Sequence, residues 1–77
     1  MKSNIFILGD IVKTDGKKIT VKCEEMRKNV IKNNFEPVNN FYEVEYNGAD
    51  LLNRRVFIDG HKTKNDKIIA LDIKILN

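Results

Sequence analysis

The chain has 77 residues, of which 42% are hydrophobic, and a formal net charge of +3. This length allows one small core and excludes two-domain enzymes, doubly wound nucleotide-binding sheets and (β/α)₈ barrels. No apolar run approaches the length of a membrane span, and the single cysteine, Cys23, cannot form an internal disulfide. We therefore expect one domain, residues 1–77, in a reducing cytoplasm and without a membrane segment.

The composition favours strands over helices. Ile and Val supply 16 of the 32 apolar residues, whereas Ala supplies two. Side chains branched at Cβ suit a pleated surface, and scarce Ala is unusual for a helical bundle. The sequence therefore predicts an all-β protein.

Two strands and a tight turn are expected at the start of the chain. Residues 4–13 predict a strand whose first half, Ile5–Leu8, is apolar on both sides, so we expect both of its faces to be buried. Gly9 allows this strand to bend. Asp15–Gly16 is typical of a hairpin turn, and residues 17–23 alternate as a second strand with Cys23 on its inward face.

The segment 24–40 is open to two interpretations. Met26, Val30 and Ile31 have helical spacing and predict about two turns of helix over residues 25–33. The same residues are equally compatible with a long basic connection.

The second half of the chain predicts three more strands and one helical turn. The strands cover residues 41–46, 55–60 and 67–76, and a helical turn covers 49–53, with a polar turn over 62–66. The side chains expected to face inward are Tyr42, Val44, Tyr46, Val56, Ile58, Ile69, Leu71, Ile73 and Ile75. Five strands with a short helix between the third and fourth are typical of the OB-fold, a five-stranded Greek-key barrel.

Four stretches resemble bacterial single-stranded-DNA-binding proteins and the related primosomal replication protein, in the order of that family. They are Asn4–Ile11, Tyr46–Leu52, Arg55–His61 and Lys67–Leu76. The resemblance implies a reduced OB-fold protein, because the family's barrel is longer and its stacking tryptophans are absent here. It implies single-stranded DNA or RNA as partner, homo-oligomerisation, and a role in DNA replication, repair or mobile-element maintenance.

The candidate nucleic-acid site combines cations for phosphates with a ring for base stacking. We expect it on the outward face of the second and third strands and in the flanking loops. Its residues are Lys18, Lys22, Arg27, Lys28, Lys32, Phe41, His61, Lys62 and Lys64.

An opposing interpretation rests on Glu43 and Glu45, which share the outward side of the third strand with Phe41. If Lys18 and Lys22 pair with these carboxylates, the charge for binding phosphate is cancelled. The alternatives are then a protein-interaction barrel without nucleic-acid binding, or a translation-factor-like RNA-binding barrel. Phe57 is a candidate oligomer contact.

Enzyme signatures are missing from the sequence. It contains no P-loop, no GxGxxG and no HExxH motif, and one His with one Cys cannot form a zinc site of the usual spacing. The only serine, Ser3, lies near the start of the chain. We therefore expect a protein that is not an enzyme and has no metal or other cofactor.

Overall fold

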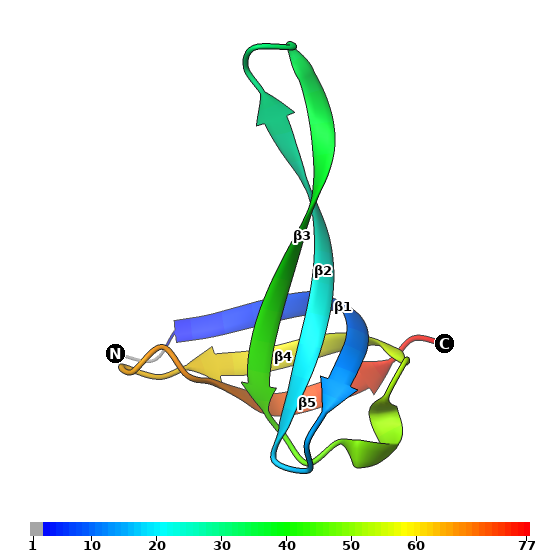
Figure 1. Ribbon diagram of the computed structural model, residues 1–77. Helices are drawn as coiled ribbons and strands as arrows, with labels where there is room; N and C mark the ends of the chain where they lie inside the picture. The colour runs from blue at the N-terminus through cyan, green and yellow to red at the C-terminus, as the bar shows by residue number, and fades with distance from the viewer. Residues whose placement is uncertain (1–2) are drawn as a thin grey trace.

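The structure, a computed structural model that describes residues 3–77, consists almost entirely of β-strands (Figure 1). Its elements are β1 (Ser3–Thr14), β2 (Lys18–Asn29), β3 (Asn34–Glu45), a 3₁₀ turn η1 (Ala49–Leu51), β4 (Arg55–Lys62) and β5 (Ile68–Ile75). The all-β prediction is confirmed, and so is the helical turn between the third and fourth strands. No helix among residues 3–77 is long and apolar enough to cross a membrane.

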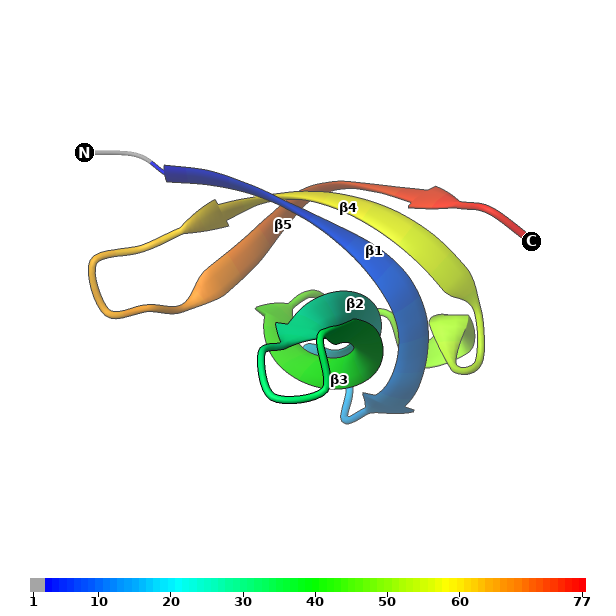
Figure 2. The same ribbon diagram turned by 90° about the horizontal axis from the view of Figure 1, so that it is seen from above.

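The five strands form one sheet whose order, β1-β2-β3-β5-β4, closes on itself. Neighbouring strands are antiparallel except β3 and β5, which are parallel. β1 joins both halves of the sheet, because Ser3–Asp10 pairs with β4 and Asp10–Thr14 pairs with β2. The strand consequently bends around the core, as the view from above shows (Figure 2).

The core lies inside this ring and is entirely apolar. Its buried residues are Ile7, Ile11, Ile19, Val21, Cys23, Val44, Leu51, Val56, Ile58 and Ile68. Burying each large side chain contributes about 1.5–3 kcal/mol, so these residues dominate the stability of the fold. The inward orientation predicted for Val44, Val56 and Ile58 is confirmed, and Tyr42 packs against the core. Tyr46 was expected inside but follows the end of β3 and is exposed.

The first strand is buried on one face only, so the expectation of two buried faces is wrong. Ile7 and Ile11 point into the core, whereas Phe6 and Leu8 are exposed, Phe6 with 62% of its surface. The ring of Phe6 stacks on Phe57 of β4, with ring centroids 5.9 Å apart. This apolar run therefore supplies an outer surface as well as the core.

The predicted turn between the first two strands is confirmed. Gly16 has a φ of 90°, which glycine adopts at little cost. The Oδ1 atom of Asp15 accepts hydrogen bonds from the backbone N–H groups of Lys17 and Lys18, at 2.9 and 2.7 Å. These bonds favour the ionised carboxylate and lower the pKa of Asp15 below its usual value.

Residues 24–40 form neither a helix nor an irregular connection. β2 continues to Asn29 and β3 begins at Asn34, so the two strands form a long twisted hairpin that projects from the body (Figure 1). Asn29 Oδ1 accepts the backbone N–H groups of Ile31 and Lys32, both at 3.1 Å, and Asn33 has a φ of 53°. Asparagine side chains readily accept hydrogen bonds from the backbone a few residues later, and asparagine tolerates a positive φ. These residues therefore form the turn that joins β2 and β3.

The inward position predicted for Ile73 in the last strand is confirmed, but the inward positions predicted for Ile69 and Leu71 are wrong, because β5 contains a bulge. Asp59 lies opposite Asp72, but Gly60 lies opposite Ala70, so Leu71 has no partner on β4. An extra residue reverses the side to which the following side chains point. Ile68 and Ala70 therefore face the core before the bulge, with Ile73 after it, while Leu71 is exposed and Ile69 and Ile75 lie outside the core cluster.

Candidate nucleic-acid interface

The hairpin of β2 and β3 has two sides because side chains alternate along each strand. One side continues the core through Ile19, Val21 and Cys23. The opposite side, here called the outer hairpin face, carries six cross-strand pairs. They are Lys18–Glu45, Thr20–Glu43, Lys22–Phe41, Glu24–Asn39, Met26–Pro37 and Lys28–Phe35.

Two of these pairs join a phenylalanine to a lysine. Phe41 lies opposite Lys22, and Phe35 lies opposite Lys28. Both rings are exposed, with 61% and 65% of their surface open to solvent, respectively. Among residues 3–77, neither lysine takes part in an ion pair. The outward position predicted for Phe41 is therefore confirmed.

Phe35 is a candidate that the sequence analysis missed. The segment around it was interpreted as a helix or a connection, and neither interpretation predicts on which side of a sheet the ring of Phe35 lies. Its only signal in the sequence is parity: Phe35 and Phe41 are six residues apart, so they share a face if the whole segment is extended.

The base of the outer hairpin face is largely neutral. Lys18 Nζ lies 3.9 Å from Glu43 Oε2, and Lys67 Nζ lies 4.0 Å from Glu45 Oε1. All four side chains remain well exposed, so each pair contributes at most about 1 kcal/mol. Lys18 is thus in the pairing that the opposing interpretation anticipated, whereas Lys22 is not.

The cations near the hairpin tip point in different directions. Lys32 lies in the turn and pairs with Glu36 at 3.6 Å, and Glu36 also accepts the side-chain amide of Asn29 at 3.3 Å. Arg27 lies opposite Glu36 on the other side of the hairpin from Lys28. Val30 and Ile31 at the tip are almost fully exposed.

The turn between β4 and β5 borders the base of the outer hairpin face. Asp66 and Lys67 line a cavity of about 100 Å³ together with Lys18, Glu43 and Glu45. Within this region, Lys62 pairs with Asp66 at 3.7 Å, and Lys64 is exposed in the turn. His61 was expected in the loop but is a residue of β4, half-buried between Asn4 and Ile69 in the ladder.

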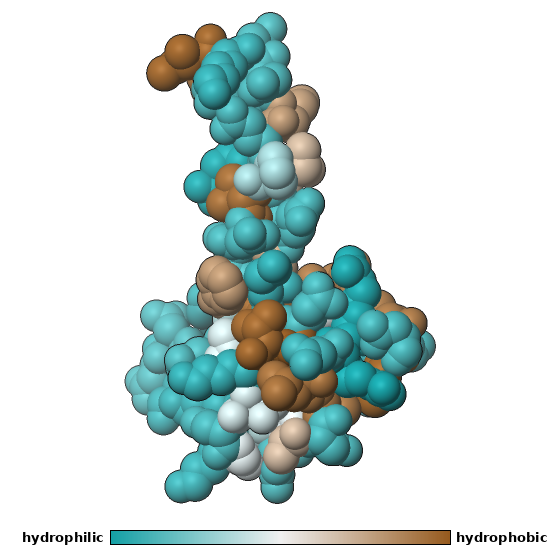
Figure 3. All heavy atoms as spheres, turned by 45° about the vertical axis from the view of Figure 1, so that its right-hand side comes forward, coloured by the Kyte–Doolittle hydropathy of each residue, from teal (hydrophilic) through white to brown (hydrophobic). Residues whose placement is uncertain are grey.

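The structure therefore brings together only part of the predicted site. Lys18, Lys22, Lys28 and Phe41 share the outer hairpin face, while Arg27 lies behind it and Lys32 at the tip. The space-filling view shows the hairpin as a mostly hydrophilic arm with separate hydrophobic side chains along it and at its tip (Figure 3). Such a surface offers rings and cations along a line of about 20 Å between Phe35 and Phe41, at 3.3 Å per residue.

Residues 3–77 contain no group of three or more His, Cys, Asp or Glu side chains placed to hold a metal ion. Burial raises the pKa of the Cys23 thiol, which favours the less reactive thiol form. The outer hairpin face thus offers two exposed rings, each opposite a lysine that makes no ion pair within the described residues.

Comparison with family models, with curated proteins and with solved structures gives no match for this sequence.

Proposed function

We propose that this chain is a small OB-fold protein that binds single-stranded nucleic acid without strong sequence preference, along the outer hairpin face. The order β1-β2-β3-β5-β4, the parallel contact of β3 with β5 and a long first strand shared between both halves are features of the OB-fold. In that fold the face of the second and third strands is the usual binding surface for oligonucleotides.

The observation that carries the proposal is the repeated Phe–Lys pair on one side of the hairpin. In each pair the ring provides a surface for a base, and the lysine directly opposite provides a cation for the adjoining phosphate. Stacking is worth about 1–3 kcal/mol per base and tolerates every base. Binding of this kind explains exposed phenylalanines in a hairpin whose distal half buries no side chain.

The proposal is tested by fluorescence anisotropy with labelled oligo-dT, oligo-rU and a duplex of equal length, at two salt concentrations. About three phosphate contacts predict a log–log salt slope of about −2 for single strands. The single strands should bind more tightly than the duplex. Equal affinity for the duplex would mean charge attraction alone and would contradict the proposal.

A variant with both Phe35→Ala and Phe41→Ala should lose single-strand affinity by about 2–6 kcal/mol, because two stacking surfaces are removed. The matched control is Phe6→Ala, which removes an equally exposed ring from another face and should leave the affinity of a single copy unchanged, measured at a protein concentration too low for self-association. Both variants should remain folded, since none of these rings belongs to the core.

The second candidate function is a protein-interaction module without nucleic-acid binding. The specific observation in its favour is the pairing of Lys18 with Glu43 and of Lys67 with Glu45, which neutralises the base of the outer hairpin face. It is the conclusion to adopt if neither oligo-dT nor oligo-rU binds.

Homo-oligomerisation is part of the primary proposal. The outer face of β1 and β4 carries Phe6, Leu8 and Phe57, all exposed. Lys74 and Asp72 of β5 adjoin them, opposite Phe57 and Asp59. When a second copy packs against this face after a rotation of 180°, the basic side of one copy meets the acidic side of the other. Joining two hairpins would lengthen the binding surface and raise the avidity.

A further inference from the structure

The N-terminal half of β1 has one paired edge and one free edge. Ser3–Asp10 pairs with β4 along its whole length, but β2 joins the other edge of β1 only from Asp10 onward. From Glu24 to Asn29, β2 pairs with β3 alone and diverges from β1 (Figures 1 and 2). A wedge is thus left open between the free edge and the hairpin.

The free edge presents backbone groups in a defined order. Ile11 donates its N–H to Arg54 and accepts the N–H of Asn53, so its polar groups point to the β4 side. Hydrogen-bonding direction alternates along a strand, and the even-numbered residues therefore point their N–H and C=O groups to the free edge. These residues are Asn4, Phe6 and Leu8. Among residues 3–77, no strand pairs with them on this side.

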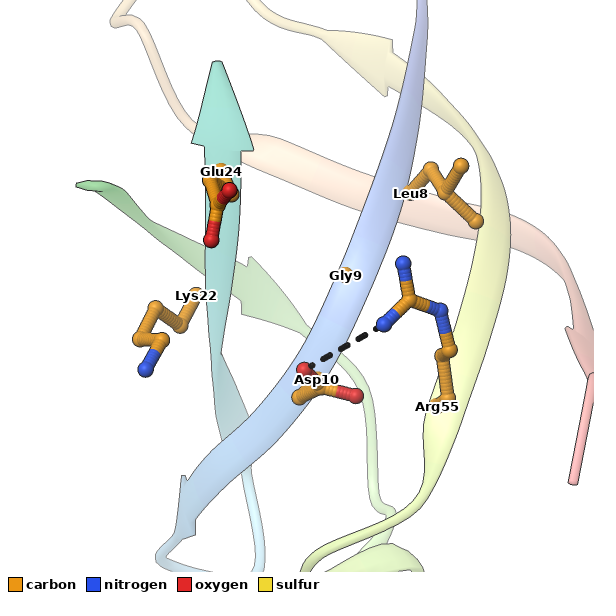
Figure 4. A pocket seen from close by; sticks show the side chains of 6 residues that line it. All are labelled: Leu8, Gly9, Asp10, Lys22, Glu24 and Arg55. Carbon is orange, nitrogen blue, oxygen red and sulfur yellow. Dashed lines mark ion pairs between the residues drawn. The ribbon is translucent and has the colours of Figure 1, made fainter. Parts of the chain in front are cut away.

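Cavities lie on both sides of this edge. One, of about 310 Å³, lies on the core side and is lined mainly by Ile5–Leu8, Cys23, Glu25 and Tyr42. The other, of about 440 Å³, lies on the outer side between Leu8, Asp10, Lys22, Glu24 and Arg55 (Figure 4). Leu8 and Glu24 line both cavities. Alternate side chains of an added strand point to opposite sides, and at this edge each set of side chains would lie at one of the two cavities.

Carboxylates outnumber cations around the wedge, because the two cavities are lined by Asp10, Glu24 and Glu25 but also by Lys22 and Arg55. Glu24 and Glu25 are neighbours on β2 and therefore point to opposite sides; Glu24 lines both cavities, and Glu25 lines the core-side cavity alone. Within the described chain, neither forms an ion pair. Glu25 accepts hydrogen bonds from Asn40 at 2.8 Å and from the Tyr42 hydroxyl at 3.5 Å. On the outer side, the carboxylate of Asp10 is occupied by Arg55 at 3.7 Å (Figure 4).

We infer that the free edge of β1 binds an extended peptide that carries alternating apolar and basic side chains, as an added strand. The backbone of the peptide pairs with Asn4, Phe6 and Leu8. Its lysine or arginine side chains all point to the outer side, where they reach Glu24, and its apolar side chains point to the core-side cavity. A nucleic acid fits this wedge poorly, because its phosphates would meet two carboxylates. This site shares Lys22 and Glu24 with the outer hairpin face but does not include its phenylalanines, and it does not depend on the function proposed there.

The added strand has a defined end. At Gly9 the two strands approach so closely that a Cβ atom would overlap the carbonyl oxygen of Lys22. The wedge is therefore closed at Gly9 and open toward Ser3. The peptide pairs with about six residues of β1, a usual length for a strand.

The test uses a labelled heptapeptide of alternating lysine and valine, with capped ends, added to the whole chain. Anisotropy should show saturable binding. The same peptide with alternate backbone nitrogens methylated should bind at least about tenfold more weakly, because its hydrogen bonds to the edge are lost. Binding of the methylated peptide with equal affinity would overturn the proposal.

The charge is tested with the double variant Glu24→Gln, Glu25→Gln, which should weaken peptide binding by about tenfold. The matched control, Glu43→Gln with Glu45→Gln, removes the same charge from the outer hairpin face and should leave peptide affinity within about twofold. An equal loss of peptide affinity in both double variants would show that binding depends only on net charge, and would overturn the proposed site.

Hydrogen exchange locates the contact and separates a peptide from a second copy of this chain. In the Phe57→Ser variant, which is expected to stay monomeric, the amides of Phe6 and Leu8 should exchange rapidly at every concentration of the free protein and slow down on saturation with peptide. Slow exchange that appears without peptide at high protein concentration would assign the edge to a second copy and overturn the proposal. Loss of oligo-dT binding in the phenylalanine variants leaves these outcomes unaffected, so the two proposals fail separately.

Discussion

At the scale of single residues, Gly9 determines how β1 crosses from one half of the sheet to the other. It is buried, and its Cα lies against the backbone of β2, where Lys22 and Val21 leave no room for a side chain. The sequence predicts a bend at this glycine. The structure adds the reason for it, which is close approach of two strands and not an unusual backbone angle.

Gly9→Ala should therefore lower the free energy of unfolding by about 1–3 kcal/mol, because the backbone must shift to accept the methyl group. The measurement is chemical denaturation followed by circular dichroism. Gly16→Ala is the comparison, since its site has no atom within 4 Å of the added Cβ and bears only the strain of a positive φ. An unchanged stability for Gly9→Ala would show that β1 and β2 separate easily at this point.

At the scale of elements, the long hairpin is independent of the core. No residue between Glu24 and Phe41 belongs to the buried cluster, so the distal hairpin contributes backbone pairing and little apolar burial. Elements with few buried contacts open at low free energy. The hairpin is thus an appendage whose side chains are available for binding rather than for stability.

Replacing residues 26–37 by Asn-Gly should leave the body folded, because Glu25 and Val38 lie directly opposite and this dipeptide favours a two-residue hairpin turn. The shortened chain should keep a cooperative thermal transition but lose most single-strand binding, since Phe35 and Lys28 are removed. Circular dichroism and anisotropy measure the two effects. Full retention of oligo-dT affinity would show that the nucleic acid binds elsewhere.

At the scale of the whole molecule, charge and exposed apolar surface decide which partners can approach. The carboxylates of Glu43 and Glu45 hold two lysines in exposed ion pairs at the base of the hairpin. The opposite part of the molecule presents the stacked rings of Phe6 and Phe57. Electrostatic interactions therefore determine which partners bind at the base of the hairpin, and apolar contacts determine which partners bind at the rings of Phe6 and Phe57.

Replacing both Glu43 and Glu45 by Gln should tighten single-strand binding and make its salt slope steeper, because Lys18 and Lys67 are released to contact phosphate. Stability should change by no more than about 1 kcal/mol per pair, since exposed pairs contribute little. Anisotropy at several salt concentrations measures the slope. Asp50→Asn, in η1, is the control for net charge and should leave the slope unchanged.

Self-association through Phe6, Leu8 and Phe57 predicts a molecular mass that rises with protein concentration in sedimentation experiments. Phe57→Ser should keep the chain monomeric over about a hundredfold range of concentration, because it removes one ring of the stacked pair from the contact. Phe35→Ser on the hairpin is the matched control and should not alter the mass. A wild-type chain that stays monomeric throughout would contradict this part of the proposal.

The sequence by itself predicted the elements that are defined by alternating apolar side chains or by turn residues within a few positions of one another. Ile19–Cys23, Asp15–Gly16, Ala49–Leu51 and Val56–Ile58 lie as expected, because each depends on neighbours a few residues away. The outward position of Phe41 followed from the same alternation. For these segments, the period of the apolar side chains is sufficient to define the structure.

Only the tertiary structure decided the long hairpin, the single buried face of β1 and the bulge at Leu71. In residues 24–40 the spacing of Met26, Val30 and Ile31 fits a helix, but the backbone groups of this segment form hydrogen bonds between β2 and β3 instead. The spacing of apolar side chains along one segment does not reveal such pairing between two strands. The position of Phe35 beside Lys28 likewise depends on cross-strand register. Burial depends on what covers a strand, and for Phe6 and Leu8 no described part of the same chain does so.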